Sequence, residues 1–262
     1  MDLQGTHIVI TGASRGIGEA IAEQLANRGA HLTLVARPSV ALNAVAAKFR
    51  GNAYAADLAD ATQVDTLVAR LEEDAGSPID ILINNAGIEL TKSFLTASSD
   101  DVRRIHQVNL ITPTELCRQV LPGMVRRGRG HIVNVSSMAS VSGFPGIALY
   151  GSTKAGLSHF SRLLRQDLKG TPIGVTSVEL GPIPTDLLDE VNAYEPAQRS
   201  FARLRRMQLL PNVSREKAAT EIVKAIEGNK RNVRLPARAA AFPMFGALPQ
   251  RIVDTLIRDI TP

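Results

Sequence analysis

The chain has 262 residues, and 30 lysines and arginines against 25 aspartates and glutamates give a formal net charge of +5. Hydrophobic residues make up 44% and charged residues 21%, a composition that excludes a disordered or collagen-like protein. Charged or polar residues interrupt every apolar run well before about 18 residues, so no membrane span is expected.

The start of the chain and its one cysteine predict a cytoplasmic protein. Residues 1–9 contain no basic segment followed by a long apolar core, so no secretory leader is expected. Cys117 has no partner for an internal disulfide, which fits a reducing compartment. The mild positive charge permits phosphorylated small molecules as ligands and does not demand nucleic acid.

Short apolar runs alternate with helical patterns along the chain. We expect strands at residues 7–10, 31–36, 52–56, 79–83, 132–135, 173–178 and 232–235. Helices are expected at 16–28, from a cap at Ser39 to about Phe49, and from a cap at Asp60 to the turn at Gly76. Apolar strands linked by helices are typical of a parallel sheet, so we predict an α/β doubly wound fold of about seven strands with helices on both faces.

A glycine-rich loop, Thr11-Gly12-Ala13-Ser14-Arg15-Gly16-Ile17-Gly18, lies between the first strand and the first helix. Glycines let backbone N–H groups approach a pyrophosphate, and the helix N-terminus adds partial positive charge. Glycine is also common in ordinary turns, but this position after a first strand favours a dinucleotide site.

The end of the second strand indicates which dinucleotide is preferred. NAD sites place an acidic residue there to hold the ribose 2′-hydroxyl, but no acidic residue occurs from Gln24 to Ala56. Arg15 and Arg37 are instead suited to a 2′-phosphate. We therefore expect NADP(H) in preference to NAD(H), the alternative being that both arginines are simply solvated.

Polar residues follow the third and fourth strands. Asp57 is suited to accept a hydrogen bond from an adenine amino group, although helix capping near Asp60 is an alternative. Asn84-Asn85-Ala86-Gly87 suits a ligand crevice at the carboxyl end of a strand, although an ordinary Asn-Gly turn has the same composition.

Tyr150 and Lys154 are four residues apart in a helical pattern, so both side chains should lie on one face. An ammonium beside a phenol favours the phenolate, so we expect the pKa of Tyr150 to be lowered toward the range of acid–base catalysis. Ser136-Ser137 follows the fifth strand, where a hydroxyl is placed to orient a substrate oxygen. The alternative is an ordinary Tyr–Lys pair on a helix.

Five motifs occur in order: Thr11-Gly12-x-x-x-Gly16-x-Gly18, Asn84-Asn85-Ala86-Gly87, Asn109, Ser137 and Tyr150-x-x-x-Lys154. Their order and spacing resemble those of the short-chain dehydrogenase/reductase family over about residues 5–185. Ser137 matches better than Ser136, because it stands 13 residues before Tyr150, which is the family's interval. The resemblance implies one NAD(P)-binding Rossmann domain over residues 1–262.

The resemblance also implies a role for each catalytic residue. Tyr150 is expected to protonate a carbonyl oxygen, or to act as base when an alcohol is oxidised, and Ser137 to hydrogen-bond the same oxygen. Lys154 is expected to bind the nicotinamide ribose and to lower the pKa of Tyr150, and Asn109 to hold a proton-relaying water.

The expected cofactor contacts follow from the loop and from the resemblance together. They are Gly12, Ser14, Arg15, Gly16, Ile17, Gly18, Arg37, Asp57, Leu58, Asn85, Ala86, Gly87, Tyr150, Lys154, Pro182, Ile183 and Thr185. One departure from the family pattern is Leu180, which replaces the proline of its Pro-Gly pair before this last segment.

Residues 185–212 correspond to the family's variable substrate lid, and here they are rich in apolar side chains. We expect an apolar carbonyl or alcohol substrate, lipid-like, steroid-like or linked to an acyl carrier. The expected substrate-facing residues are Ser137, Phe144, Tyr150, Leu187 and Leu188. The alternative is that these apolar residues only pack the lid on the core.

Residues 236–262 form an apolar C-terminal extension, for which covering the pocket, a subunit contact and a membrane-surface contact stay open. No metal site is expected, because His106, His131 and His159 lack ligand spacing. The leading hypothesis is an NADP(H)-dependent ketone reductase or alcohol dehydrogenase working as a homodimer or homotetramer. The alternatives are an NAD(H)-dependent relative, a non-catalytic dinucleotide sensor and a nucleic-acid binder.

Overall fold

The computed structural model describes residues 1–184, 191, 193–208, 211–237, 248–256 and 259. Seven strands form one sheet in the order β3-β2-β1-β4-β5-β6-β7, and every neighbouring pair is parallel. The strands are β1 His7–Thr11, β2 His31–Ala36, β3 Asn52–Ala55, β4 Ile81–Asn84, β5 Gly130–Ser137, β6 Ile173–Leu180 and β7 Asn232–Leu235.

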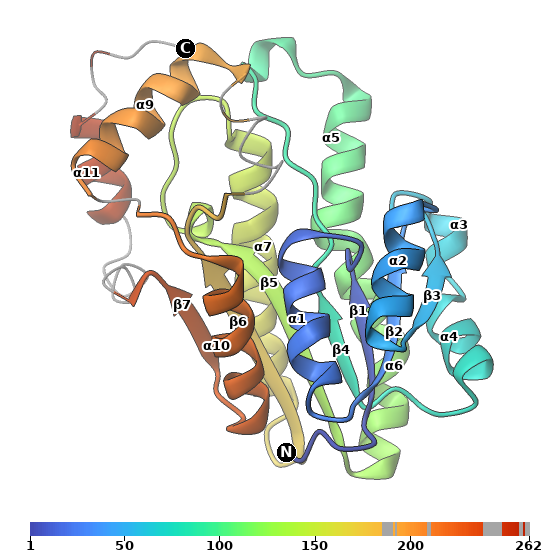
Figure 1. Cartoon of the computed structure of the whole chain (residues 1–262). Coiled ribbons are helices and arrows are strands. Elements are labelled where there is room, and N and C mark those ends of the chain that lie inside the picture. Colours follow the sequence, from blue (N-terminus) through green and yellow to red (C-terminus); the bar gives the residue numbers. More distant parts are fainter. Residues whose placement is uncertain (185–190, 192, 209–210, 238–247, 257–258, 260–262) are drawn as a thin grey trace.

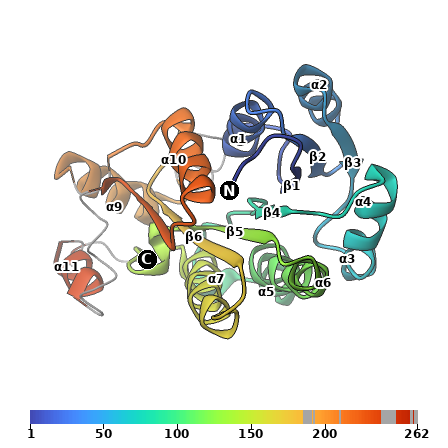
Figure 2. The same ribbon diagram turned by 90° about the horizontal axis from the view of Figure 1, so that it is seen from below.

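Helices cover both faces of the sheet (Figure 1). They are α1 Gly16–Ala26, α2 Val40–Phe49, α3 Ala61–Val64, α4 Leu67–Ala75, α5 Ser99–His106, α6 Thr112–Arg127, α7 Ala148–Asp167, α9 Glu195–Arg206, α10 Arg215–Glu227 and α11 Leu248–Leu256. Figure 2 shows α1, α2 and α10 on one face and α4, α5, α6 and α7 on the other. The predicted doubly wound α/β fold is therefore confirmed.

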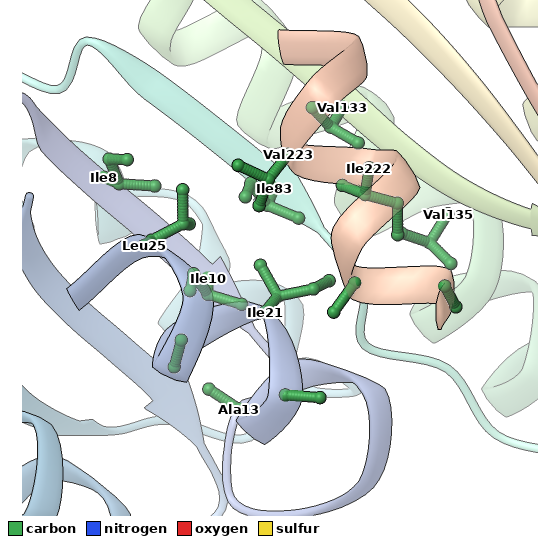
Figure 3. Close-up of a cluster of buried hydrophobic side chains, with 14 of the residues drawn as sticks. Ile8, Ile10, Ala13, Ile21, Leu25, Ile83, Val133, Val135, Ile222 and Val223 are labelled. Atoms are coloured by element: carbon green, nitrogen blue, oxygen red, sulfur yellow. The ribbon is translucent and has the colours of Figure 1, made fainter. Parts of the chain in front are cut away.

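The apolar core lies between the sheet and these helices, because the central strands are buried on both faces. On one side α1 and α10 pack over β1, β4 and β5, with Ile21, Leu25, Ile222 and Val223 against the strands (Figure 3). On the other side, α4 and α6 pack over Val9, Leu82 and Ile132. The two cores fix the strand ends that carry the polar motifs.

The predicted helix that follows Asp60 is two helices in the structure. Asp60 caps α3 by accepting a hydrogen bond from Thr62 N (2.9 Å), as expected. The helix then breaks because the Gln119 side chain of α6 donates to Val64 O (2.8 Å) and accepts from Val68 N (3.2 Å). These are the two groups that a continuous helix would join to each other.

The helix start predicted at Ser39 agrees with the structure. Ser39 caps α2, with its Oγ accepting from Leu42 N (3.1 Å). α6 ends at Arg127, with Gly128 in the left-handed conformation, as is common after a helix. No helix in the described ranges is both long and apolar enough to cross a membrane.

Candidate active site

The strand order reverses between β1 and β4, so the carboxyl ends of these strands flank a crevice where doubly wound folds bind ligands. The residues that follow the two strands are tied together. Thr11 Oγ1 accepts hydrogen bonds from Asn85 N (3.1 Å) and Ala86 N (3.0 Å). Asn85 Nδ2 donates to Thr11 O (3.0 Å) and Gly12 O (3.1 Å). Asn85 therefore braces the glycine-rich loop.

The glycines of this loop occupy positions where a side chain does not fit. Gly12 has φ +67°, and a Cβ there would lie 2.8 Å from Ala86 Cα. A Cβ on Gly18 would overlap Gly12 O and lie 2.8 Å from Asn85 Nδ2. Within the described residues no side chain caps the N-terminus of α1, so its first N–H groups are suited to a phosphate. This backbone cradle fits the pyrophosphate of a dinucleotide.

The two arginines expected at the 2′-phosphate lie at the same edge of the sheet. Arg15 is in the loop after β1, Arg37 directly follows β2, and both side chains are exposed. β1 and β2 pair with Thr11 opposite Val35, which places the two following segments side by side. Two exposed guanidinium groups therefore lie at the edge where the loop after β1 and the end of β2 meet.

Asp57 follows β3 at this same edge and is half-buried. Its Oδ1 accepts from Ala59 N (3.0 Å), while its own N–H donates to Gln63 Oε1 (3.0 Å). Leu58 is buried, and its carbonyl accepts from Thr112 Oγ1 (2.8 Å). Asp57 thus shapes the turn, and Asp60, not Asp57, caps the next helix.

Asn84 lies beneath the crevice and does not face it. Its side chain is buried and donates to Pro113 O (3.2 Å) and Asn134 Oδ1 (2.8 Å) between the sheet and α6. Cys117 is buried beside it, and burial raises the pKa of this thiol to about 12, so Cys117 is no reactive nucleophile.

Tyr150 and Lys154 lie on the first turns of α7, on the face toward β5. Both are buried, and Lys154 Nζ lies 5.8 Å from the centre of the Tyr150 ring. Lys154 Nζ donates to Val135 O (3.0 Å). Ser137 ends β5, where its Oγ accepts from Ala139 N (3.1 Å) and donates to Leu180 O (3.4 Å). The structure brings together the three residues that the sequence singled out.

The expected direction of the tyrosine pKa is wrong in this structure. Burial raises the pKa of Tyr150 above its usual value, and the Glu89 carboxylate raises it further, while a hydrogen bond with Ser137 lowers it. Burial lowers the pKa of Lys154 to about 8, although the Glu89 carboxylate acts in the opposite direction and raises this pKa. Desolvation is the largest cause of both shifts, because burial disfavours the charged form of each group, the phenolate of Tyr150 and the ammonium of Lys154.

Asn109 lies in a π-helical turn, Gln107–Ile111, between α5 and α6, and it is fully buried. Its Oδ1 accepts from Ile88 N (2.8 Å), and its Nδ2 donates to Ile88 O (2.9 Å) and Thr153 Oγ1 (3.3 Å). A Cβ on Gly87 would lie 3.2 Å from Lys154 Nζ and 3.3 Å from Asn109 Oδ1. Asn109 thus fixes the segment after β4 beside Lys154.

Sequence reasoning missed the polar contacts that hold α7 on β5. Ser136 Oγ donates to Lys154 O (2.8 Å) and accepts from Ser158 Oγ (2.8 Å), and Asn134 Nδ2 donates to Ser161 Oγ (2.9 Å). The signal is in the strand, since Asn134 and Ser136 alternate with core residues and so share one face. Glu89 was also missed, and nothing in its spacing marks it.

The substrate side is described in part. Phe144 is half-buried and packs against Phe201 of α9, with ring centres 6.0 Å apart in an edge-on arrangement. Ile183 is buried in the core beside Pro182, whose carbonyl accepts from Val213 N (2.8 Å). Thr185, Leu187 and Leu188 lie outside the described residues. Among the residues that are described, no group of three His, Cys, Asp or Glu side chains is placed to hold a metal ion.

Comparison with known proteins identifies one family. The family model for short chain dehydrogenases matches residues 6–196. The ketoacyl reductase HetN of a Nostoc species is 39% identical over 67% of this chain and 63% of its own length, so the match spans less than two thirds of that relative. The fatty acyl-CoA reductase of Mycobacterium tuberculosis is 33% identical over 98% of this chain and 85% of its own.

Solved structures agree with the sequence comparison. A short-chain dehydrogenase from Sphingobium yanoikuyae, solved in complex with NADPH, superimposes with a TM-score of 0.79 at 29% identity, over 98% of this chain and 96% of that chain.

Proposed function

The chain belongs to the short-chain dehydrogenase/reductase family of NAD(P)-dependent oxidoreductases, and we propose that it reduces an apolar ketone or aldehyde with NADPH. The same site would oxidise the corresponding alcohol, secondary from a ketone or primary from an aldehyde, with NADP⁺. The observation that carries this proposal is the placement of Ser137, Tyr150 and Lys154 together at the carboxyl edge of the sheet, beside the glycine-rich loop.

The residues that would hold the dinucleotide lie at the carboxyl edge of the sheet, along the crevice. Gly12, Gly16 and Gly18 would admit its pyrophosphate, Arg15 and Arg37 its 2′-phosphate, and Asp57 its adenine. NADPH supplies a hydride when it is bound, and the protein supplies position and a proton. The NADPH held by the Sphingobium relative supports the choice of NADP(H).

Tyr150 is proposed to donate its phenolic proton to the carbonyl oxygen during reduction. Its raised pKa supports this direction, because burial keeps the phenol protonated at neutral pH, the form that an acid needs. Ser137 Oγ would hydrogen-bond the same oxygen. Lys154, whose pKa is about 8, would remain largely charged at pH 7 and bind the nicotinamide ribose, while Asn109 would position the water that returns a proton.

An acyl chain is the substrate class that we favour. Two relatives are named for ketoacyl and fatty acyl reduction. Tyr150 belongs to an apolar cluster with Ile147 and Leu149, and Phe144 packs against this cluster. These apolar surroundings support an apolar substrate.

The experiment that tests this function measures NADPH absorbance at pH 7 with a panel of ketones and aldehydes of increasing chain length. We expect carbonyl-dependent oxidation of NADPH that is fastest with apolar carbonyls. If no carbonyl in the panel accelerates NADPH oxidation, and no secondary alcohol accelerates NADP⁺ reduction, the proposal is wrong.

The cofactor preference is tested separately by comparing the dissociation constants of NADPH and NADH. A 2′-phosphate on two arginines gains charge-assisted hydrogen bonds, so we expect NADPH to bind at least about tenfold more tightly. Tighter binding of NADH would contradict the proposed role of Arg15 and Arg37.

We also propose a cytoplasmic homodimer or homotetramer that assembles through α6 and α7. Leu163 of α7 and Val125 of α6 are exposed apolar side chains on the outer layer of the same sheet face. Light scattering of the purified protein measures the assembly, and a monomer would contradict it.

A further inference from the structure

The C-terminal helix α11 is fastened to the loop that precedes α7. Gln250 Oε1 accepts a hydrogen bond from Gly143 N (2.7 Å), and Gln250 Nε2 donates to Gly143 O (3.2 Å). Asp254, one turn later, accepts from the same Nε2 (2.7 Å) and holds the amide in place. A side-chain amide that pairs with both backbone groups of one residue fixes that residue in two directions.

The same end of the chain is fastened to α9. Arg203 Nη1 donates to Leu256 O (2.9 Å). Arg203 also forms a bidentate ion pair with Asp259, in which Nη2 donates to Oδ2 (2.9 Å) and Nη1 to Oδ1. Arg203 lowers the pKa of Asp259 to about 2, so the pair stays charged at neutral pH. α9 and α11 lie side by side at the upper left of Figure 1.

Phe144 joins the three segments that meet here. It packs against Tyr150 and Ile147 in one apolar cluster, against Leu204 and Val253 in a second, and against Phe201 in a third. The loop after Phe144 is also in contact with the start of α9, since a Cβ on Gly146 would lie 2.7 Å from the Tyr194 ring. α9, α11 and the loop therefore form one packed unit next to Tyr150.

We propose that α11 is a brace that fixes the 141–147 loop against α9, and that Gln250 and Arg203 thereby limit the size of the substrate group accepted beside Tyr150. The proposal rests on the proposed reductase function. Gln250 and Arg203 are positioning residues, because they act through Phe144 and the loop and not on the reacting atoms. The proposal assigns α11, the described helix of the C-terminal extension, to covering the substrate side.

The position of Phe144 depends on the conformational freedom of the 141–147 loop. Residues 141–147 contain two glycines and are followed directly by α7, so a displacement of the loop moves Phe144 relative to Tyr150. Loops of this composition have high conformational entropy, which contacts from outside must offset. Gln250 supplies that restraint by hydrogen bonds and Val253 by packing.

The brace is tested by hydrogen–deuterium exchange of backbone amides in the full-length protein. We expect Gln250→Ala to speed exchange in residues 141–147 by about tenfold, because two hydrogen bonds are lost. Arg251→Ala, an exposed neighbour on the same helix, is the matched control and should leave exchange unchanged. Unchanged exchange in Gln250→Ala would overturn the brace.

Substrate selection is tested with NADPH and the methyl ketones from 2-butanone to 2-decanone. Gln250→Ala and Arg203→Ala should change the ratio of kcat/KM between long and short ketones by about tenfold, through KM more than kcat, with NADPH affinity unchanged. Arg206→Ala, also exposed on α9, is the control for Arg203. An unchanged ratio would overturn the limit on size.

The two proposals fail differently. Absence of turnover in every protein, wild type included, contradicts the reductase function and with it the limit on substrate size, while the exchange experiment still decides whether the brace exists.

Discussion

Burial determines the protonation of Tyr150 and Lys154, the two titratable groups on the first turns of α7. Their separation by four residues on a helix predicts one face, and the structure places them there. The spacing does not reveal that both side chains are buried, and burial decides the direction of both pKa shifts. A sequence pattern thus predicts which groups meet better than it predicts their protonation.

Glu89 is the residue whose role a sequence pattern did not show. Its carboxylate raises the pKa of Tyr150 and Lys154, and its Oε1 accepts from Leu90 N (3.1 Å) and Thr91 Oγ1 (3.1 Å). Glu89→Gln keeps an acceptor oxygen and removes the charge, so the phenolate becomes easier to form. The pH profile of kcat/KM for alcohol oxidation, in which we propose deprotonated Tyr150 as the base, should therefore shift to lower pH.

The control for this experiment is Glu73→Gln, an exposed position on α4 away from the crevice. Its pH profile should match that of the wild type. A profile of Glu89→Gln that stays in place or moves to higher pH would contradict the electrostatic role of Glu89.

The strands were predicted well, because local apolar patterns decide them. The helices α5 and α10 were not predicted, although Ser98 and Ser214 cap their starts. The positions of the apolar runs predicted all seven strands, and Ser39 and Asp60 predicted the starts of two helices. The break between α3 and α4 was missed because the Gln119 side chain that causes it comes from a distant part of the chain. The π-helical turn at Asn109 was missed because its contacts with Ile88 are also tertiary.

The turn from β1 into α1 carries a prediction at the scale of an element. A methyl group on Gly18 would lie 2.8 Å from Asn85 Nδ2 and 2.9 Å from Ala13 Cα, so the loop must shift. Gly18→Ala should lower the free energy of unfolding by roughly 1–3 kcal/mol and weaken NADPH binding. Urea unfolding and fluorescence titration measure the two effects.

Gly123→Ala is the matched control, since Gly123 lies within α6 and a methyl group there meets only the ends of two side chains, Arg126 and Arg127, the second of which donates to Ile79 O (2.7 Å). It should be neutral or stabilise the protein by up to about 1 kcal/mol, because alanine favours helix. If both variants bind NADPH like the wild type, the loop is not a tight cradle.

The stability of the whole molecule depends on polar groups enclosed in the sheet. His131 of β5 is buried and hydrogen-bonded to Thr176 Oγ1 of β6 (2.8 Å), and burial lowers its pKa from 6.5 to about 4. The unfolded chain binds a proton below pH 6.5 that the folded protein does not bind until about pH 4. The folded state should therefore lose stability as the pH falls through this window.

Between pH 7 and pH 5 this loss should be about 2 kcal/mol in the free energy of unfolding. His131→Gln, which removes the titration, should show a drop smaller by that amount in urea unfolding at the two pH values. His159→Gln, an exposed position on α7, should behave as the wild type. An equal drop in His131→Gln and the wild type would mean that other groups govern acid sensitivity.

The tertiary contacts on the substrate side could not be predicted from the sequence. Phe144 was expected to face the substrate or to pack the lid, and in the structure it packs on α9 and α11. The contacts of Gln250 with Gly143 and of Arg203 with Asp259 join residues 107 and 56 positions apart, which no local pattern reports. The crevice was easier to predict because each of its motifs directly follows a strand.

The most direct measurement for the central claim is turnover by Tyr150→Phe, with NADPH affinity measured on the same preparation. Removing the phenolic hydroxyl leaves the packing of the ring and removes the proposed proton donor. We expect carbonyl-dependent NADPH oxidation to fall by roughly 10²- to 10⁴-fold while the dissociation constant of NADPH stays within about twofold. Turnover equal to that of the wild type would contradict the assignment of Tyr150 as the acid.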